Sequence, residues 1–443
     1  MARARDILRS GTWLTRERVR LIAAAILLAS VAGFLYLVVT ANGLVDTQGR
    51  PLGTDFSSFY AAGTYVLDGD PEAPFDIARQ QAREQEIFGA ATPLYSWFYP
   101  PFFLALAAVL ALMPYGLALA LWQAVTLGLY LVAIWAILIP VRRPCAAGLA
   151  PPGRLTDDHL WLLVALGFPA VLINIGHGQN GFLTAALLGA ALLKLNRQPL
   201  LAGILFGLLA YKPQFGLMIP IALAAGGRWR TFAAAAATVA ALVVATTLAF
   251  GPQVWSAFFD SARLARLAVE QGGVDWYKMQ SVFAWARMWH APIPVAYALQ
   301  SAVIVAMGGA LAWLWHGRAS YPVKAAALCL AAIPATPFAA DYDMMVLAPA
   351  IAFLVADGCK RGFAPWEKTA LAGLWLTPLV ARSIAQATLI PFGVPAILVM
   401  FMLLLRRSTG DFASAMAFPD TATKISGSMG GRTRGHDIAA FKS

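Results

Sequence analysis

The chain has 443 residues, of which 60% are hydrophobic and only 12% are charged. Soluble globular proteins carry about 25% charged residues, so this composition excludes an ordinary soluble protein. A net charge of +11 would indicate nucleic-acid binding in a soluble chain. Here the basic residues lie between and beyond apolar runs, where membrane topology and anionic headgroups explain them. We therefore predict an all-α polytopic membrane protein without a nucleic-acid partner.

The N-terminal residues 1–19 are basic and precede a first apolar run at 20–40. This run is long and no small-residue cleavage site is evident, so we interpret it as a retained span and not as a removed signal peptide. Apolar runs then recur to residue 405, several of them shorter than the roughly 20 residues of a perpendicular span. They cover 116–139, 159–175, 179–195, 199–211, 213–226, 231–250, 292–315, 322–339, 344–357, 367–383 and 389–405.

The apolar run Tyr99–Pro114 is short, has prolines at both ends, and decides the topology. With a cytoplasmic N-terminus, the preceding loop 41–98 is outside, and it holds eight acidic residues against three arginines. If Tyr99–Pro114 does not cross, every later basic connection falls in the cytoplasm, as the positive-inside rule requires. We therefore predict a re-entrant or interfacial outer segment, about twelve spans, and both termini inside. The basic connections are Arg142/Arg143, Arg197, Arg228/Arg230, Arg318/Lys324, Lys360/Arg361 and Arg406/Arg407.

This topology gathers the polar segments on one side of the membrane. Besides the first outer loop, it places on the outer side residues 174–181, 211–215, 251–291 and 336–345. The expected organisation is a basic cytoplasmic segment 1–19, a membrane domain 20–405, and a Gly/Ser/Ala/Thr-rich disordered tail 406–443. A functional site is therefore expected to face outward.

Two charged residues in these segments each have two interpretations. Asp55 precedes "FSSFYAAGTYVL" and suits a helix N-cap, a role that does not exclude general-base chemistry. Lys212, in "YKPQF", either extends its ammonium to the outer headgroups or binds an anion such as a lipid phosphate. The adjacent proline breaks the helix and frees backbone amides that could share that anion.

Other polar clusters are less specific. In "GHGQNG", His177, Gln179 and Asn180 form either a polar hairpin or part of a site, and a lone histidine is no metal site. In "DYD", Asp341 and Asp343 flank Tyr342 and could bind a divalent cation or sugar hydroxyls, or could simply begin a helix. No cofactor is predicted beyond this possible cation. None of the usual nucleotide-binding, serine-hydrolase or zinc-protease motifs occurs.

Taken in chain order, these motifs resemble glycosyltransferase family 87. They are an Asp-Phe at 55–56, FYPPF at 98–102, GQN at 178–180, KPQ at 212–214, QS at 280–281 and PFAADYD at 337–343. The resemblance covers roughly residues 53–349. It implies a GT-C superfold enzyme that moves a hexose, mannose in the mycobacterial members, from a polyprenyl-phosphate donor to a glycolipid or glycan acceptor. Transfer would occur with inversion on the periplasmic face of a bacterial inner membrane.

The resemblance also implies roles for individual residues. Asp55 matches the catalytic aspartate of the first outer loop and would be the general base. The donor-binding candidates are Lys212, Gln214, Gln179, Asn180, His177 and Tyr99. Further site candidates are Asp341, Tyr342, Asp343, Gln280 and Ser281. The mycobacterial mannosyltransferases have a His-Tyr pair near the last motif where this chain has "DYD", so the sugar and acceptor stay open.

Two other function classes fit parts of the sequence. A transporter or flippase of lipid-linked sugars would usually show matching repeats with broken helices, and none is evident. A lipid-linked glycan polymerase or ligase would use arginines in a late outer loop, where this chain has Arg263, Arg266 and Arg287. A monophosphate donor would distinguish a transferase from this last class, which uses diphosphate-linked glycans.

Overall fold

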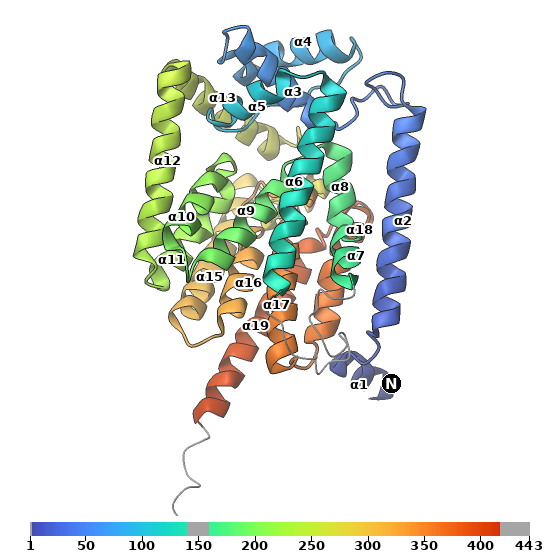
Figure 1. The fold of residues 1–443 in the computed structure, drawn as a ribbon, viewed down its shortest axis with the longest axis vertical. Helices are drawn as coiled ribbons and strands as arrows, with labels where there is room; N and C mark the ends of the chain where they lie inside the picture. The colour runs from blue at the N-terminus through green and yellow to red at the C-terminus, as the bar shows by residue number, and fades with distance from the viewer. Residues whose placement is uncertain (1, 140–158, 417–443) are drawn as a thin grey trace, which may run out of the picture.

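The computed structural model describes residues 2–139 and 159–416, and this part of the chain is built from helices. Nineteen α-helices and five 3₁₀ helices form it, and its only β-type pairing consists of three isolated bridges (Figure 1). The predicted all-α class is therefore confirmed. The basic pair at 142–143 and residues 417–443 lie outside the described residues.

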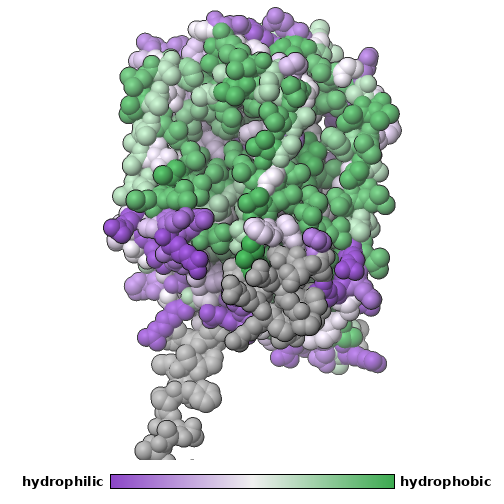
Figure 2. Space-filling view, in the orientation of Figure 1, coloured by the Kyte–Doolittle hydropathy of each residue, from purple (hydrophilic) through white to green (hydrophobic). Residues whose placement is uncertain are grey.

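Several helices are long and apolar enough to cross a membrane, as the sequence predicted. The long ones are α2 (Arg16–Thr40), α6 (Tyr115–Leu138), α12 (Trp229–Phe250), α15 (Ile293–His316) and the continuous stretch η5 (Asp341–Val346) with α17 (Leu347–Arg361). A sixth span is possible if α7 (Leu160–Leu166) and α8 (Pro169–His177), bent by 48°, count as one. Figure 2 shows the matching apolar band, with hydrophilic residues at its upper and lower ends.

The remaining apolar runs form shorter helices, so length and composition identify fewer crossings than the predicted twelve. These helices are α9 (Gly181–Lys194), α10 (Pro199–Leu208) followed by η2 (Leu209–Tyr211), η3 (Pro213–Leu217) with α11 (Met218–Ala225), and α16 (Tyr321–Ala332). They pack inside the bundle together with α17, whereas α2 and α12 lie at its edges (Figure 1). The two C-terminal helices are α18 (Glu367–Thr388) and α19 (Gly393–Met416).

Residues 56–111, which include most of the loop predicted to be outside, fold into a helical cap at the end of the bundle opposite the N-terminal helix α1 (Ala2–Ser10) (Figure 1). The cap comprises α3 (Phe56–Leu67), η1 (Ala73–Phe75), α4 (Ile77–Phe88) and α5 (Phe103–Ala111). With nine residues, α5 is about 14 Å long, less than half of the roughly 30 Å hydrocarbon layer. Its length agrees with the prediction that Tyr99–Pro114 does not cross as a helix.

The second outer loop joins the same cap. It contains α13 (Gln253–Gln271), η4 (Trp276–Lys278) and α14 (Val282–Met288). The rings of Phe75 and Phe258 pack edge to face with centroids 5.9 Å apart, which connects the two loops. Met279 pairs with Ala340 in an isolated antiparallel bridge, so this loop also supports the segment that begins η5.

At the opposite end of the bundle, buried ion pairs connect three helices. Arg407 of α19 pairs with Asp357 of α17 at 2.6 Å and with Glu367 of α18 at 2.5 Å. Helix α19 continues to Met416. The prediction of a disordered tail beginning at residue 406 is therefore wrong for 406–416, because the helix there carries the arginine that pairs with both buried carboxylates.

The close packing of α3 on α5 depends on Gly63. A Cβ at this position would lie 2.1 Å from the backbone oxygen of Ala107, which cannot move without displacing α5. We expect Gly63→Ala to lower the thermal unfolding temperature in detergent, by the equivalent of about 1–3 kcal/mol of overpacking. Gly116→Ala on α6 is the control, since nothing lies within 4 Å of its added Cβ. Equal stability of the two variants would contradict the packing.

Candidate active site

Asp55 stands at the N-cap position of α3 but does not cap the helix. Its side chain makes no hydrogen bond to a first-turn amide. Instead, Oδ2 accepts a 2.8 Å hydrogen bond from Nε2 of Gln179. The carboxylate is one quarter exposed, and its Oδ1 has two longer contacts, with the Thr54 hydroxyl at 3.5 Å and with Nδ1 of His177 at 3.7 Å. One carboxylate oxygen is thus fixed in place while the other remains able to accept a proton.

Gln179 connects Asp55 to the segment before α5. Its Oε1 accepts hydrogen bonds from the Tyr99 hydroxyl at 3.1 Å and from the backbone amide of Asn180 at 3.0 Å. Both ends of the amide are therefore occupied, which fixes its orientation and directs Nε2 at Asp55. The sequence predictions for Asp55, Tyr99 and Gln179 thus converge in one hydrogen-bonded group drawn from three distant segments.

His177 lies on the other side of Asp55. Its Nδ1 is 2.8 Å from the Thr54 hydroxyl and 3.7 Å from Oδ1 of Asp55, and its backbone oxygen accepts from the Asp55 amide at 2.9 Å. Its Nε2 lies 3.5 Å from Nη2 of Arg382. A guanidinium only donates, so Nε2 is the acceptor and Nδ1 carries the proton that faces Thr54 and Asp55. This tautomer is assigned from the contacts.

The two carboxylates of "DYD" are both buried and both paired with cations. Asp341 accepts from Nε and Nη2 of Arg382 at 2.8 and 2.5 Å. Asp343 accepts from Nζ of Lys212 at 2.5 Å and from the Ala340 amide at 2.9 Å. Tyr342 lies between the pairs, its ring 5.0 Å from Nζ of Lys212 and 6.1 Å from the His177 ring. These contacts bring the predicted residues of four segments into one cluster.

Arg382 was missed by the sequence analysis, which placed it near the end of the apolar run 367–383. A lone arginine in such a run is itself a signal, because an intramembrane charge is costly and usually functional. Its partner Asp341 could not be assigned without the fold, since 41 residues separate them.

Three candidates lie outside this cluster. Gln214 is half-buried in η3, and no hydrogen bond joins it to the Asp55 group. Ser281 caps α14 by accepting from the Ala284 amide, and Gln280 accepts from the Gly393 amide at 3.0 Å. The roles visible for Gln280 and Ser281 are thus structural, since they position α14 and α19.

The described residues offer no good cation site in this cluster. They contain no group of three or more His, Cys, Asp or Glu residues arranged to hold a metal ion. Each carboxylate of "DYD" is already neutralised by a buried or half-buried side-chain cation. The divalent cation considered from the sequence therefore does not fit these residues.

The arginines of the loop 251–291 make their contacts within that loop. Arg263 pairs with Asp260, and Arg266 pairs with Glu270. Arg287 donates to the backbone oxygens of Ala291 and Glu270. None of these contacts directs an arginine into the Asp55 group.

With this geometry established, comparison with known families becomes informative. The model of glycosyltransferase family 87 matches residues 97–340, more than half of the chain. The chain belongs to glycosyltransferase family 87. No curated protein and no solved structure matches it. The matched region contains Tyr99, Gln179 and Lys212, whereas Asp55 and Arg382 lie outside it, so the match itself supports no role for these two residues.

A buried glutamate in the cap adjoins the Asp55 group. Glu84 of α4 is fully buried, accepts from the Tyr95 amide at 2.9 Å, and accepts from Nε2 of Gln80 at 3.3 Å. Burial raises the pKa of its carboxyl to about 8, and the negative charge of Asp55 adds to the shift. Glu84 is thus protonated at neutral pH and links α4 to the segment that leads to Tyr99.

Glu84 makes stability depend on pH. An unfolded glutamate ionises near pH 4.5 and the folded one only near pH 8, so ionisation of the unfolded state increasingly opposes folding across this window. We expect Glu84→Gln to raise the unfolding temperature, by little at pH 5 and by more at each step up to pH 8. Gln80 can present its unpartnered Oε1 to the new amide. Thermal melts in detergent measure this effect, with the exposed Glu86→Gln as control. A pH-independent difference would contradict the assignment.

Proposed function

We propose that this glycosyltransferase moves a hexose, mannose-like, from a polyprenyl-phosphate donor to an acceptor hydroxyl, with inversion and with Asp55 as general base. The observation that carries the proposal is the environment of the Asp55 carboxylate. It makes no capping hydrogen bond to α3, it accepts a hydrogen bond from Gln179, and it is partly exposed. The acceptor is a glycolipid or glycan. Membrane lipids surround the enzyme, and no nucleotide donor is needed.

The proposed step is a direct displacement. The acceptor oxygen bonds to the anomeric carbon, its proton passes to Oδ1 of Asp55, and the bond from that carbon to the phosphate oxygen breaks. The leaving group is polyprenyl phosphate, whose negative charge rises by one as it departs. A positioned base contributes typically ~10²–10⁴-fold, and stabilisation of the departing charge is often the larger contribution.

Several residues would hold the donor. Gln179, Tyr99 and Asn180 surround Asp55 and would contact the sugar, with His177 beside them. Lys212, proposed from the resemblance for the phosphate, is 3% exposed and already paired with Asp343. In this proposal it balances the charge of Asp343 within the site. Gln214 keeps a donor role only if the segment of η3 moves when the donor binds.

The proposed location is a bacterial inner membrane, with both termini cytoplasmic and the site facing the periplasm. The cap that holds Asp55 lies at the end of the bundle opposite α1 (Figure 1). This arrangement supports the topology derived from charge, in which the acidic loop 41–98 is outside and the basic connections are inside.

The proposal predicts a large and selective effect of removing the base. We expect Asp55→Asn to fold, because the amide oxygen of the asparagine can accept the same hydrogen bond from Nε2 of Gln179, and to lose ~10²-fold or more in turnover. Release of polyprenyl phosphate from purified protein in nanodiscs measures this loss. Asp68→Asn, an exposed residue at the other end of α3, is the matched control.

Three outcomes would change the proposal. Near-normal turnover of Asp55→Asn would remove the base assignment. Labelled lipid-linked sugar that binds and crosses vesicle membranes without being consumed would indicate a flippase. Consumption of diphosphate-linked oligosaccharide alone would indicate a polymerase or ligase.

A further inference from the structure

Arg382 is the more accessible of the two cations in the site. Its side chain is 36% exposed, whereas that of Lys212 is 3% exposed. Asp341 engages Nε and Nη2 of the guanidinium, and no hydrogen bond to another described residue involves Nη1. Arg382 therefore combines a fixed orientation with unused donors, which suits recognition of an anionic oxygen.

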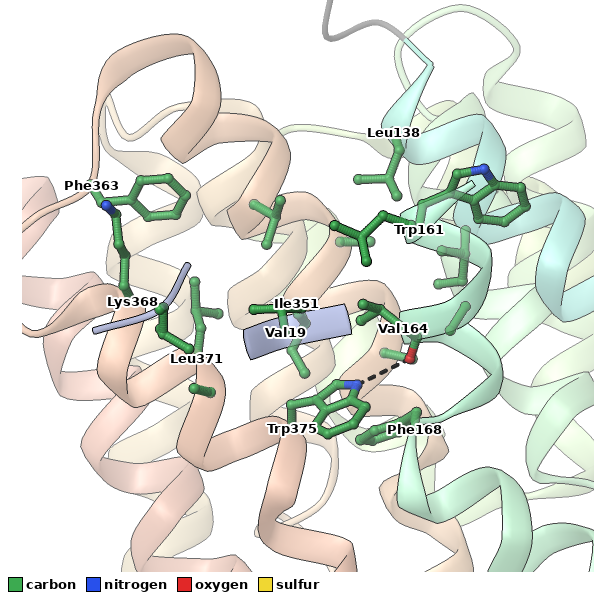
Figure 3. Close-up of a pocket in the computed structure, with 18 of the residues that line it drawn as sticks. Val19, Leu138, Trp161, Val164, Phe168, Ile351, Phe363, Lys368, Leu371 and Trp375 are labelled. Atoms are coloured by element: carbon green, nitrogen blue, oxygen red, sulfur yellow. Dashed lines mark hydrogen bonds between the residues drawn. The ribbon is translucent and has the colours of Figure 1, made fainter. Parts of the chain in front are cut away.

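An apolar cavity of about 210 Å³ lies deeper in the bundle, between α6, α7, α17 and α18 (Figure 3). Trp161, Phe168, Ile351, Leu371 and Trp375 are among its walls, and Nε1 of Trp375 donates to the backbone oxygen of Val164 at 3.2 Å. We name it the α18 cavity. An apolar cavity of about 150 Å³ in another protein stays dry and binds benzene, so this one has room for a short piece of hydrocarbon chain.

The cavity and Arg382 lie along one face of the same helix. Leu371 and Trp375 line the cavity, and Arg382 follows Trp375 by seven residues. Seven residues are nearly two turns, so the two side chains lie on one side of α18, about 10 Å apart along the axis, with Pro378 in the helix between them. Helix α8 runs in parallel from Phe168, at the cavity, to His177, beside Arg382. Two elements thus pass from the cavity to the site.

Helix α2 contributes little to the wall of the cavity and buries little of its own surface. Val19 lines the cavity, yet Ala23 is the only buried residue among the 25 of this helix. Ala23 packs against Gly167, where an added Cβ would lie 2.7 Å from the backbone oxygen of Ala23. Past Arg20, the side chains that α2 exposes are mostly apolar. We expect a lipid chain to reach the cavity beside this helix.

We propose, on the basis of the proposed function, that Arg382 binds the donor phosphate and that the lipid chain of the same donor occupies the α18 cavity. A single amphiphile then satisfies both features, with its anionic head at unused Nη1 and its chain along α18. Asp341 positions Arg382, and the arginine stabilises the charge that develops on the departing phosphate. A membrane phospholipid seated in the cavity from the other side, near Lys368, is the competing occupant.

The test is equilibrium binding of the product, which requires no catalysis. Purified full-length protein is titrated with undecaprenyl phosphate, with undecaprenol, and with five-carbon dimethylallyl phosphate, which is too short to reach the cavity from Arg382. Native mass spectrometry counts the bound ligand. The variants are Arg382→Gln, Arg382→Lys and the cavity-filling Ala372→Phe, with Leu379→Phe as the control on the exposed face of α18. Thermal melts establish that each variant is folded.

The expected affinities distinguish binding of the phosphate headgroup from binding of the lipid chain. Arg382→Gln binds both phosphates about 10–100-fold more weakly, which corresponds to the loss of one hydrogen bond to a charged group. Its affinity for undecaprenol equals that of the wild type. Arg382→Lys keeps the fold and the charge but binds both phosphates less tightly than the wild type. Ala372→Phe loses at least tenfold for undecaprenyl phosphate and nothing for dimethylallyl phosphate. The control matches the wild type.

Other patterns overturn the inference. Wild-type affinity of Arg382→Gln for both phosphates removes the head assignment. If Ala372→Phe binds undecaprenyl phosphate as the wild type does but loses bound phospholipid, the occupant of the cavity is the membrane phospholipid. If even the wild type binds no undecaprenyl phosphate, the donor class of the proposed function fails together with this inference.

Discussion

The ion pair between Asp341 and Arg382 joins the start of η5 to the C-terminal half of α18, and the orientation of the neighbouring His177 depends on it. Asp341 is 2% exposed, so without the arginine it would be an unpaired buried charge, a loss of about 3–5 kcal/mol. The pair also orients the guanidinium so that Nη2 faces Nε2 of His177. Because a guanidinium only donates, this Nε2 must be the unprotonated acceptor nitrogen. His177 in turn presents Nδ1–H to Thr54 and Asp55.

The second buried pair, Lys212 with Asp343, completes the charge balance. Two carboxylates and two cations flank Tyr342, so Asp55 contributes the remaining net negative charge of this cluster when His177 is neutral. Breaking a helix at Pro213 brings Lys212 into this position, because η2 and η3 replace a continuous helix there. The short, interrupted helices of this bundle therefore serve to deliver polar residues to a site within an apolar protein.

The sequence predicted the all-α class and named most residues of the cluster, because apolar runs and motif order are local signals. It could not predict the partners of Lys212 and Asp341, since these contacts join segments over 131 and 41 residues. The cap interpretation of Asp55 failed because Gln179, 124 residues away, captures its carboxylate. Glu84 was overlooked because its burial is visible only in three dimensions, and Arg382 because nothing local to the run 367–383 indicates its partner Asp341. The tail prediction was too long because the role of Arg407 as a buried partner is likewise non-local.

The most direct measurement is sugar release by the wild-type protein in nanodiscs, presented with matched polyprenyl-monophosphate, polyprenyl-diphosphate and nucleotide donors of one hexose. Periplasmic glycolipid serves as acceptor, and product polyprenyl phosphate is quantified. The account predicts consumption of the monophosphate donor alone, with the anomeric configuration inverted in the product. Consumption of a nucleotide or diphosphate donor instead, or retention of configuration, would contradict it.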